Sequence, residues 1–340
     1  MSRNQQSPLS RRGFVRQTGL LAGGIVLGAG LPPLPGAEPA SASPAGPLPQ
    51  RVLGRTGVSV TTFTLGTAPC GSAEGVSPRE IADIVNVALD EGVNSIDTAP
   101  AYVKAEEGVG LGLGKRRSGV FLATKVAADT IEDAEKSLAK SLRLLKTDYL
   151  DLVYYHSLGN RKIQGAREAE GVFTWLAKQK KAGKARFLGV SGHNLPGRFP
   201  AFLESGEVDV LLTIVNFVDR HTYRFEEDVL PIASKHKIGI VAMKVFGGAR
   251  QKSGGYKNPK SPPQMDPKHL ELAVRYSLST PGVTTLNLGV QNADQVRKNV
   301  QMLKTFQPLP PDEYQAAIAL GKPLASQWGE HFGPLREASA

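Results

Sequence analysis

The 340-residue chain contains a single cysteine, Cys70. One cysteine cannot form an intramolecular disulfide, and a metal site built on several thiolates is excluded as well. Stability must therefore come from a packed core, which a chain of this length can supply as one large domain or two modest ones. We expect no bound metal ion.

A stripe of basic residues is also missing, although the formal net charge is +10. The Lys and Arg residues are scattered through segments with helical periodicity, and no aromatic residues are interleaved with them. Nucleic-acid-binding surfaces usually gather basic residues on one face. The composition therefore favours a solvated charged surface, and no nucleic-acid partner is expected.

The apolar stretch at residues 19–31 is too short and too rich in glycine to span a bilayer well. It follows the basic sequence S-R-R-G-F at residues 10–14, and residues 40–42 offer small side chains to a signal peptidase. The pattern resembles a twin-arginine export signal. It predicts a signal peptide over residues 1–42 and a flexible leader over residues 43–49.

An export signal of this kind implies recognition by the export machinery after folding in the cytoplasm. The protein is therefore expected in the periplasm or outside the cell, with no stable membrane span after cleavage. A single uncleaved anchor helix is the alternative interpretation of the same apolar stretch.

Apolar runs of strand length alternate with segments of helical periodicity over residues 50–305. A turn at residues 54–57 joins two short runs into a hairpin, and eight strand–helix pairs follow. The predicted strands are residues 63–67, 93–97, 120–124, 149–155, 185–190, 208–215, 238–243 and 283–288. The predicted helices are residues 77–92, 103–114, 131–146, 170–182, from about 195, from about 224, 267–279 and 292–304.

The predicted strands at 149–155 and 208–215 are almost continuously apolar, as parallel strands covered on both faces must be. Eight alternating pairs predict an α/β fold, a (β/α)8 TIM barrel with an N-terminal β-hairpin, over residues 50–305. A doubly wound open sheet is the competing fold, but the turn at residues 66–71 lacks the G-x-G-x-x-G spacing. The tail, residues 306–340, is predicted to contain a helix at 312–320.

Four polar residues stand at or just after the ends of three consecutive predicted strands: Asp97, Tyr102, Lys125 and His156. Parallel strands place these ends on one face of a barrel, so their side chains should converge. A lysine cation favours ionisation of a neighbouring phenol, a carboxylate keeps the lysine charged, and a histidine orients a substrate oxygen. The set suits protonation of a carbonyl oxygen while hydride reaches the carbon, and a nicotinamide must supply the hydride.

Each of these residues also has a simpler interpretation. Asp97 fits a helix cap or a turn, Tyr102 a rim aromatic, and His156 a hydrogen-bonded core histidine. Lys125 is harder to explain in this way because a buried lysine needs a partner. Four such residues at consecutive strand ends argue against the simpler account.

Three motifs and the opening hairpin resemble the aldo-keto reductase family: Asp97-Thr98-Ala99-x-x-Tyr102, Thr124-Lys125, residues 148–156 and residues 51–57. The resemblance implies a TIM barrel that binds extended NADPH without a Rossmann motif. It implies reduction of an aldehyde or ketone to an alcohol, or the reverse, with Tyr102 as the general acid. Lys125 and Asp97 would tune this acid, and His156 would orient the carbonyl group.

The same resemblance places the cofactor-binding residues at the ends of several strands and in the last predicted helix of the barrel: Gly66, Thr67, Ser191, His193, Met243, Lys244, Gly289, Gln295 and Asn299. Some differ from the family's usual residues. Ser-Gly-His stands where Ser-Asn is common, Met243 replaces a stacking aromatic, and Gly289 and Gln295 stand where some members grip a 2′-phosphate. Arg297 and Lys298 lie close by in the sequence, and NADP(H) is favoured over NAD(H).

Substrate choice is expected to depend on the loop at 247–265 and on the tail, in which the candidates are Tyr256, Trp328, His331 and Phe332. The favoured function is a reductase of a small-molecule carbonyl compound. The first alternative is a nicotinamide-nucleotide-binding sensor or partner subunit with little turnover. The second is an unrelated barrel enzyme such as an isomerase or a lyase.

Overall fold

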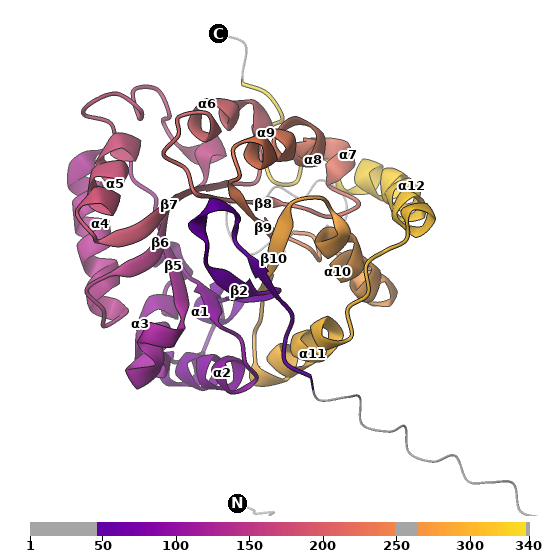
Figure 1. Cartoon of the computed structure of the whole chain (residues 1–340), viewed down its shortest axis with the longest axis horizontal. Helices are drawn as coiled ribbons and strands as arrows, with labels where there is room; N and C mark the ends of the chain where they lie inside the picture. The colour runs from indigo at the N-terminus through magenta and orange to yellow at the C-terminus, as the bar shows by residue number, and fades with distance from the viewer. Residues whose placement is uncertain (1–45, 249–263, 338–340) are drawn as a thin grey trace, which may run out of the picture. The chain divides into compact units, whose positions relative to one another are not determined.

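Eight parallel strands close into a barrel in the computed structural model, which describes residues 46–248 and 264–337 (Figure 1). The strands follow one another around the barrel in chain order, and the last closes it against the first. The predicted (β/α)8 fold is confirmed. The barrel strands are β3 (Phe63–Gly66), β4 (Ser95–Asp97), β5 (Phe121–Val126), β6 (Leu150–Tyr155), β7 (Ala185–Gly192), β8 (Val210–Ile214), β9 (Gly239–Met243) and β10 (Val283–Gly289).

An antiparallel hairpin precedes the barrel, formed by β1 (Gln50–Val52) and β2 (Ser59–Thr61), and it lies across the barrel in Figure 1. Leu53 and Val60 of the hairpin pack among the side chains that fill the barrel interior. Gly54 has a φ of +49°, and a Cβ there would lie 2.2 Å from the Gly239 nitrogen, so only glycine fits this position. The hairpin therefore closes the floor of the barrel and leaves the opposite end for ligands.

The helices cover the outside of the barrel, and two of the predicted ones are replaced by short pieces. The segment after residue 195 forms a 3-10 turn (Pro196–Arg198) and the short α6 (Pro200–Leu203). The segment after residue 219 is divided into α7 (Arg220–Tyr223), α8 (Phe225–Asp228) and α9 (Leu230–Lys235). The longer helices of the barrel are α2 (Pro78–Asp90), α3 (Ala105–Leu113), α4 (Ile131–Leu144), α5 (Val172–Lys181), α10 (Leu270–Ser279) and α11 (Ala293–Lys304).

The glycines of α3, each of which costs roughly 1 kcal/mol relative to alanine in a helix, are explained by packing. A Cβ at Gly108 would lie 2.5 Å from the side chain of Ile81 in α2. A Cβ at Gly110 would lie 2.1 Å from the carbonyl oxygen of Leu144 in α4. The glycines thus let α3 approach both neighbours closely, which fixes the segment that follows β4.

Two apolar layers surround the strands. One fills the barrel interior, and the other lies between the strands and the helices. Cys70 belongs to the outer layer, where it is fully buried in the short helix α1 (Ala68–Ser72). Burial raises the pKa of its thiol to about 11, so this cysteine is held in its unreactive protonated form.

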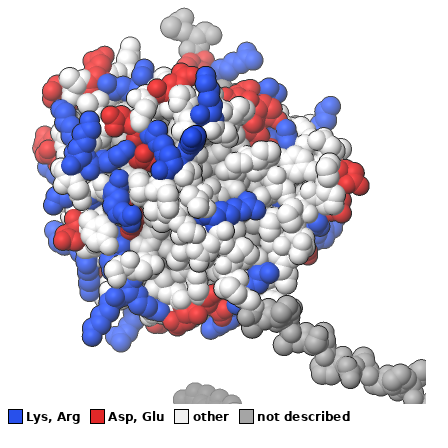
Figure 2. Space-filling model, viewed as in Figure 1, with Lys and Arg blue, Asp and Glu red and all other residues white. Residues whose placement is uncertain are grey.

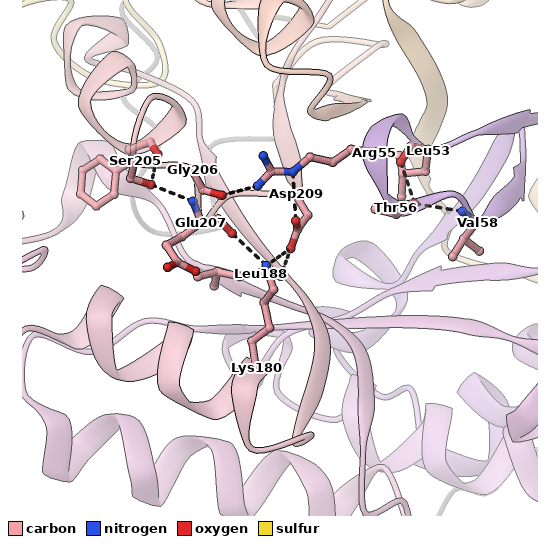
Figure 3. A network of polar contacts seen from close by, with 11 residues as sticks. Leu53, Arg55, Thr56, Val58, Lys180, Leu188, Ser205, Gly206, Glu207 and Asp209 are labelled. Carbon is pink, nitrogen blue, oxygen red and sulfur yellow. Dashed lines mark hydrogen bonds and ion pairs between the residues drawn. The ribbon is translucent and has the colours of Figure 1, made fainter.

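Asp209, the residue before β8, ties the floor of the barrel together (Figure 3). Its carboxylate pairs with Arg55 of the hairpin at 3.1 Å and with Lys180 of α5 at 2.6 Å. It also accepts a hydrogen bond from the Leu188 N–H of β7 at 3.0 Å. This floor cluster, Arg55, Lys180 and Asp209, joins four elements at the end of the barrel opposite the C-termini of the strands.

The tail begins with the helix α12 (Pro311–Trp328), which extends eight residues beyond the helix predicted at 312–320. The chain then crosses the loops that follow β7 and β8. The Leu195 N–H donates to the Pro334 carbonyl, Phe332 N–H donates to the Tyr223 hydroxyl, and Arg198 pairs with Glu337. Residues 329–337 therefore form a strap over part of the barrel mouth.

The charges on the face that carries the hairpin are of both signs and are interspersed, as Figure 2 shows. Basic side chains are most frequent on the side formed by α4 and α5. Among the residues that the structure describes, none of the helices combines the length and the apolar character needed to cross a membrane. The predicted signal peptide, residues 1–42, and most of the loop at 247–265 lie outside the described residues.

Candidate active site

The four predicted catalytic residues lie at the ends of three adjacent strands. Asp97 is the last residue of β4, Lys125 lies near the end of β5, and His156 directly follows β6. Tyr102 lies in the short 3-10 turn, Pro100–Tyr102, that follows β4. β4 pairs with β5 and β5 with β6, so the barrel brings the four residues to one part of its mouth.

Lys125 and Asp97 form a buried ion pair at the centre of this group. The Lys125 Nζ lies 2.5 Å from the Asp97 Oδ1 and also donates to the Thr98 carbonyl at 2.7 Å. The lysine is 0% exposed and the aspartate 3%. Burial lowers the pKa of Lys125, and the Asp97 carboxylate counteracts that effect because it stabilises the charged ammonium. The simpler interpretation of Asp97 as a cap or turn acid does not account for this pair.

Tyr102 is partly exposed and lies against the lysine. The Lys125 Nζ is 4.8 Å from the centre of the Tyr102 ring. The next residue, Val103, has a φ of +51°, an uncommon conformation for a β-branched residue, and its side chain is 71% exposed at the mouth. Gly71 also constrains this turn because a Cβ there would lie 2.4 Å from the Tyr102 carbonyl oxygen. The fold thus fixes the backbone from which the phenol projects.

His156 is neutral in the folded protein. Its pKa is lowered to about 3, chiefly because burial disfavours the charged ring, with smaller effects from the nearby Lys125 and Arg161 cations. Its backbone N–H donates to the Val126 carbonyl at the end of β5. A neutral imidazole can donate one hydrogen bond to a substrate oxygen without competing with Lys125 for charge.

Two polar residues beside this group are absent from the sequence-based site. Asn287 of β10 donates from Nδ2 to the Asp97 Oδ1 at 2.9 Å. Glu106 of α3 is 2% exposed and accepts a hydrogen bond from the Thr124 hydroxyl at 2.6 Å, directly beside Lys125 in the chain. An amide residue between Leu286 and Leu288 was the sequence signal for Asn287, but its partner lies 190 residues away.

The predicted cofactor-binding residues lie around the mouth on several elements. Gly66 and Gly289 are paired at the ends of β3 and β10, and the Thr67 hydroxyl donates to the Asp97 carbonyl. The Ser191 hydroxyl accepts a hydrogen bond from the Ser157 N–H at 3.2 Å. Met243 is 7% exposed because it packs into the barrel interior.

Four further predicted residues complete this set. Lys244 follows β9 with a φ of +58°, and its carbonyl accepts a hydrogen bond from Asn216. His193 follows β7, and burial lowers the pKa of its ring well below the usual range. Gln295 lies in the first turn of α11, where its side chain accepts from the Gln291 N–H, and Asn299 is buried in the same helix.

These residues fit a bound dinucleotide. Gly289 is exposed and has no side chain, so the backbone at the end of β10 is accessible just before α11 begins. The N-terminus of α11 then follows after three residues, and a helix N-terminus favours phosphate groups. Lys244 adds a positive charge at the mouth, and the pKa of His193 is lowered partly by that charge.

The aromatic residues of the strap are buried, not displayed at the rim. Phe332 is 3% exposed, its ring lies 5.3 Å from that of His193, and the Lys244 Nζ lies 5.7 Å from its centre. His331 is fully buried with its Nε2 2.7 Å from the Asp219 Oδ1, and Trp328 packs against its ring. Tyr256, the fourth candidate for substrate contact, lies outside the described residues.

The family model of the aldo/keto reductases matches residues 62–270, a range that contains the strands β3 to β9 and the four mouth residues. The chain belongs to the aldo/keto reductase family. L-galactose dehydrogenase of Arabidopsis thaliana is 27% identical over 300 residues, which cover 77% of this chain and 90% of that protein. Glyoxal reductase of Bacillus subtilis is 34% identical over 176 residues, which cover 49% of this chain and 58% of that protein.

Solved aldo-keto reductases share the fold. The holo form of one from Bacillus halodurans has a TM-score of 0.66 and 23% identity, and the match covers 84% of this chain and all of that chain. One from Bombyx mori in complex with NADP has a TM-score of 0.63 and 21% identity, with 81% and 93% covered. This aldo-keto reductase is therefore an oxidoreductase that uses NAD(P)H for carbonyl reduction. Nothing in the described residues or these relatives supports the sensor or the isomerase alternative.

Proposed function

We propose that this aldo-keto reductase binds NADP(H) in preference to NAD(H) and reduces a small-molecule aldehyde or ketone, with Tyr102 as the general acid. The observation that carries the proposal is the buried pair of Lys125 and Asp97 beside the Tyr102 ring. A buried lysine is retained in its charged form only at a cost, and here it is held against a phenol that is open to the mouth.

The roles of the four residues follow from their charges. The Tyr102 hydroxyl donates a proton to the carbonyl oxygen, and the Lys125 ammonium stabilises the phenolate that forms. Asp97 holds the lysine in place and keeps it charged. His156, which is neutral, donates a hydrogen bond that orients the carbonyl oxygen toward Tyr102. The nicotinamide, when bound, supplies the hydride.

The preference for NADP(H) is supported by positive groups near the expected phosphates. Arg297 and Lys298 lie in α11, close to its N-terminus, and Lys244 lies at the mouth. A solved relative from Klebsiella pneumoniae, 21% identical, is in complex with NADPH, and the Bombyx mori protein is in complex with NADP. The cofactor residues named from the sequence would hold the dinucleotide along β3, β7, β9 and β10.

The acid role is tested with Tyr102→Phe. We expect the purified protein to oxidise NADPH with 4-nitrobenzaldehyde and the variant to lose turnover while it still binds NADPH. The matched control is Tyr155→Phe, because Tyr155 packs between Phe173 and Phe202 and its buried hydroxyl has no hydrogen-bond partner in the described part of the chain. That control should remain active. Full turnover in Tyr102→Phe would remove Tyr102 from the acid role.

The cofactor preference is tested by fluorescence titration of the same protein with NADPH and NADH. We expect tighter binding of NADPH and a larger loss of affinity for NADPH than for NADH in Lys298→Ala. Equal affinities for the two cofactors would contradict the preference but leave the carbonyl chemistry untouched.

We also infer that the chain is exported through a twin-arginine signal that is removed near residue 42, which leaves the barrel outside the cytoplasm. The support is the sequence of residues 10–42 alone, with its arginine pair, apolar stretch and small residues. Replacement of both Arg11 and Arg12 by lysine should leave the precursor inside the cell. Normal secretion of that variant would count against this route.

A further inference from the structure

Asn287 makes direct contact with the carboxylate of Asp97. Its Nδ2 lies 2.9 Å from the same Oδ1 that receives the Lys125 ammonium at 2.5 Å. The other carboxylate oxygen, Oδ2, is buried and has no hydrogen-bond partner among the residues that the structure describes. The orientation of Asp97 is therefore set by two donors that converge on one oxygen, one charged and one neutral.

The neighbouring strand leaves room for this amide. A Cβ at Gly66 would lie 2.3 Å from the Asn287 Oδ1, so a larger residue there would force the amide to shift. Gly66 is itself paired with Asp97 across β3 and β4, and Asn287 is paired with Thr64 across β10 and β3. The register of three strands thus places the amide beside the carboxylate, and the absence of a side chain at Gly66 leaves room for it.

The neutral donor has a specific electrostatic consequence. The Asp97 carboxylate is the counter-charge of the buried Lys125 ammonium, and a donor on its Oδ1 holds it in that position. A second cation at this position would do the same but would also repel the lysine. An amide adds the hydrogen bond without that repulsion, and it prevents rotation of the carboxylate away from Lys125.

We propose that Asn287 is a positioning residue of the proton-donating site. It fixes the Asp97 carboxylate, so that the Lys125 ammonium stays in place beside Tyr102. Its effect on catalysis passes through Asp97 and Lys125, and it rests on the proposed roles of Tyr102 and Lys125. Because Asn287 is only partly buried, direct contact with the cofactor is the competing explanation.

The first test is Asn287→Leu, which keeps the size of the side chain and removes its donor. We expect kcat to fall roughly tenfold, the lower end of the range for loss of a hydrogen bond to a charged group, with the NADPH dissociation constant unchanged.

The second test is Asn287→Asp, which places two carboxylates side by side. When the new carboxyl is protonated, it donates to Asp97 as the amide does, so activity at low pH should approach that of the parent. When it ionises, it repels Asp97 and the donor is lost, so kcat should fall as pH rises. A residue with a purely structural role would not introduce this new pH dependence.

Two controls separate the possible outcomes. Thr284→Val removes a buried polar group three residues away in β10 and should leave kcat and its pH profile unchanged. In an Asp97→Asn background, Asn287→Leu should have little further effect, because the carboxylate through which it acts is gone. Melting temperatures and NADPH titrations of each variant verify that the barrel is intact.

Parental kcat in Asn287→Leu would overturn the proposal. A raised NADPH dissociation constant with unchanged kcat would also overturn it, in favour of a cofactor contact. If Tyr102→Phe retained full turnover, the proposed general acid itself would fail. A loss of turnover in Tyr102→Phe together with an unaffected Asn287→Leu would refute the role of Asn287 alone.

Discussion

The floor cluster predicts that stability and catalysis can be changed separately. Asp209 precedes the first residue of β8, whereas the catalytic residues lie at the opposite ends of the strands. In TIM barrels the C-terminal ends of the strands carry the chemistry and the other face contributes stability. Asp209→Asn should therefore lower the melting temperature and leave kcat and KM unchanged.

The magnitude follows from the exposure of the three side chains. The Asp209 side chain is 9% exposed, whereas those of Arg55 and Lys180 are 29% and 24% exposed. Breaking a fully buried pair costs about 3–5 kcal/mol, and an exposed pair contributes about 0.2–1 kcal/mol. The two cations here can turn toward water, so Asp209→Asn should cost about 2 kcal/mol. That corresponds to a fall of roughly 4–8 °C in a domain of this size.

A second substitution sharpens the test. Asp209→Ala also removes the acceptor of the Leu188 N–H, which is buried, and an unsatisfied buried donor costs about 1–3 kcal/mol more. Thermal unfolding followed by circular dichroism should rank the parent above Asp209→Asn and Asp209→Ala last. Equal stability of all three proteins, or a loss of kcat without a loss of stability, would refute the separation of floor and mouth.

Three further outcomes are expected. His156 has a pKa of about 3 when folded and about 6.5 when unfolded, so the stability it confers is complete above pH 6.5 and is lost as pH falls. Urea unfolding at several pH values should show a fall of up to about 1.4 kcal/mol per pH unit from this group, and His156→Gln should reduce the slope. Thr124→Val removes a donor from the buried Glu106 carboxylate and should cost about 1–3 kcal/mol in urea unfolding. Gly333 has a φ of +115°, so Gly333→Ala should destabilise the strap by about 1–3 kcal/mol and speed its proteolysis, whereas Gly197→Ala, which meets open space, should not.

The strands and most of the helices could be predicted because their signals are local. Apolar runs and helical periodicity identify each element within about a dozen residues. Eight repeats of one strand–helix unit are compatible with only a few folds. Lys125 and Asp97 could be placed at one mouth because parallel strands share a direction. The parallel topology was therefore enough to predict that their side chains would pair.

Contacts between distant segments could not be predicted in this way. Asn287 meets Asp97 only because the last strand closes the barrel against the first. The glycines of α3 have a low helix propensity, and their advantage is that they allow α2 and α4 to approach closely. The burial of Phe332 depends on where the strap crosses the mouth, which its own sequence does not determine.

The inert thiol of Cys70 has a practical consequence for spectroscopy. A buried cysteine with a pKa of about 11 reacts poorly with thiol-directed probes, so the natural chain should take up little label at Cys70. A cysteine introduced at the exposed Val103 would be the reactive thiol of choice, one residue from Tyr102. A fluorophore attached there would report on cofactor and substrate arrival without removal of any natural residue from the core.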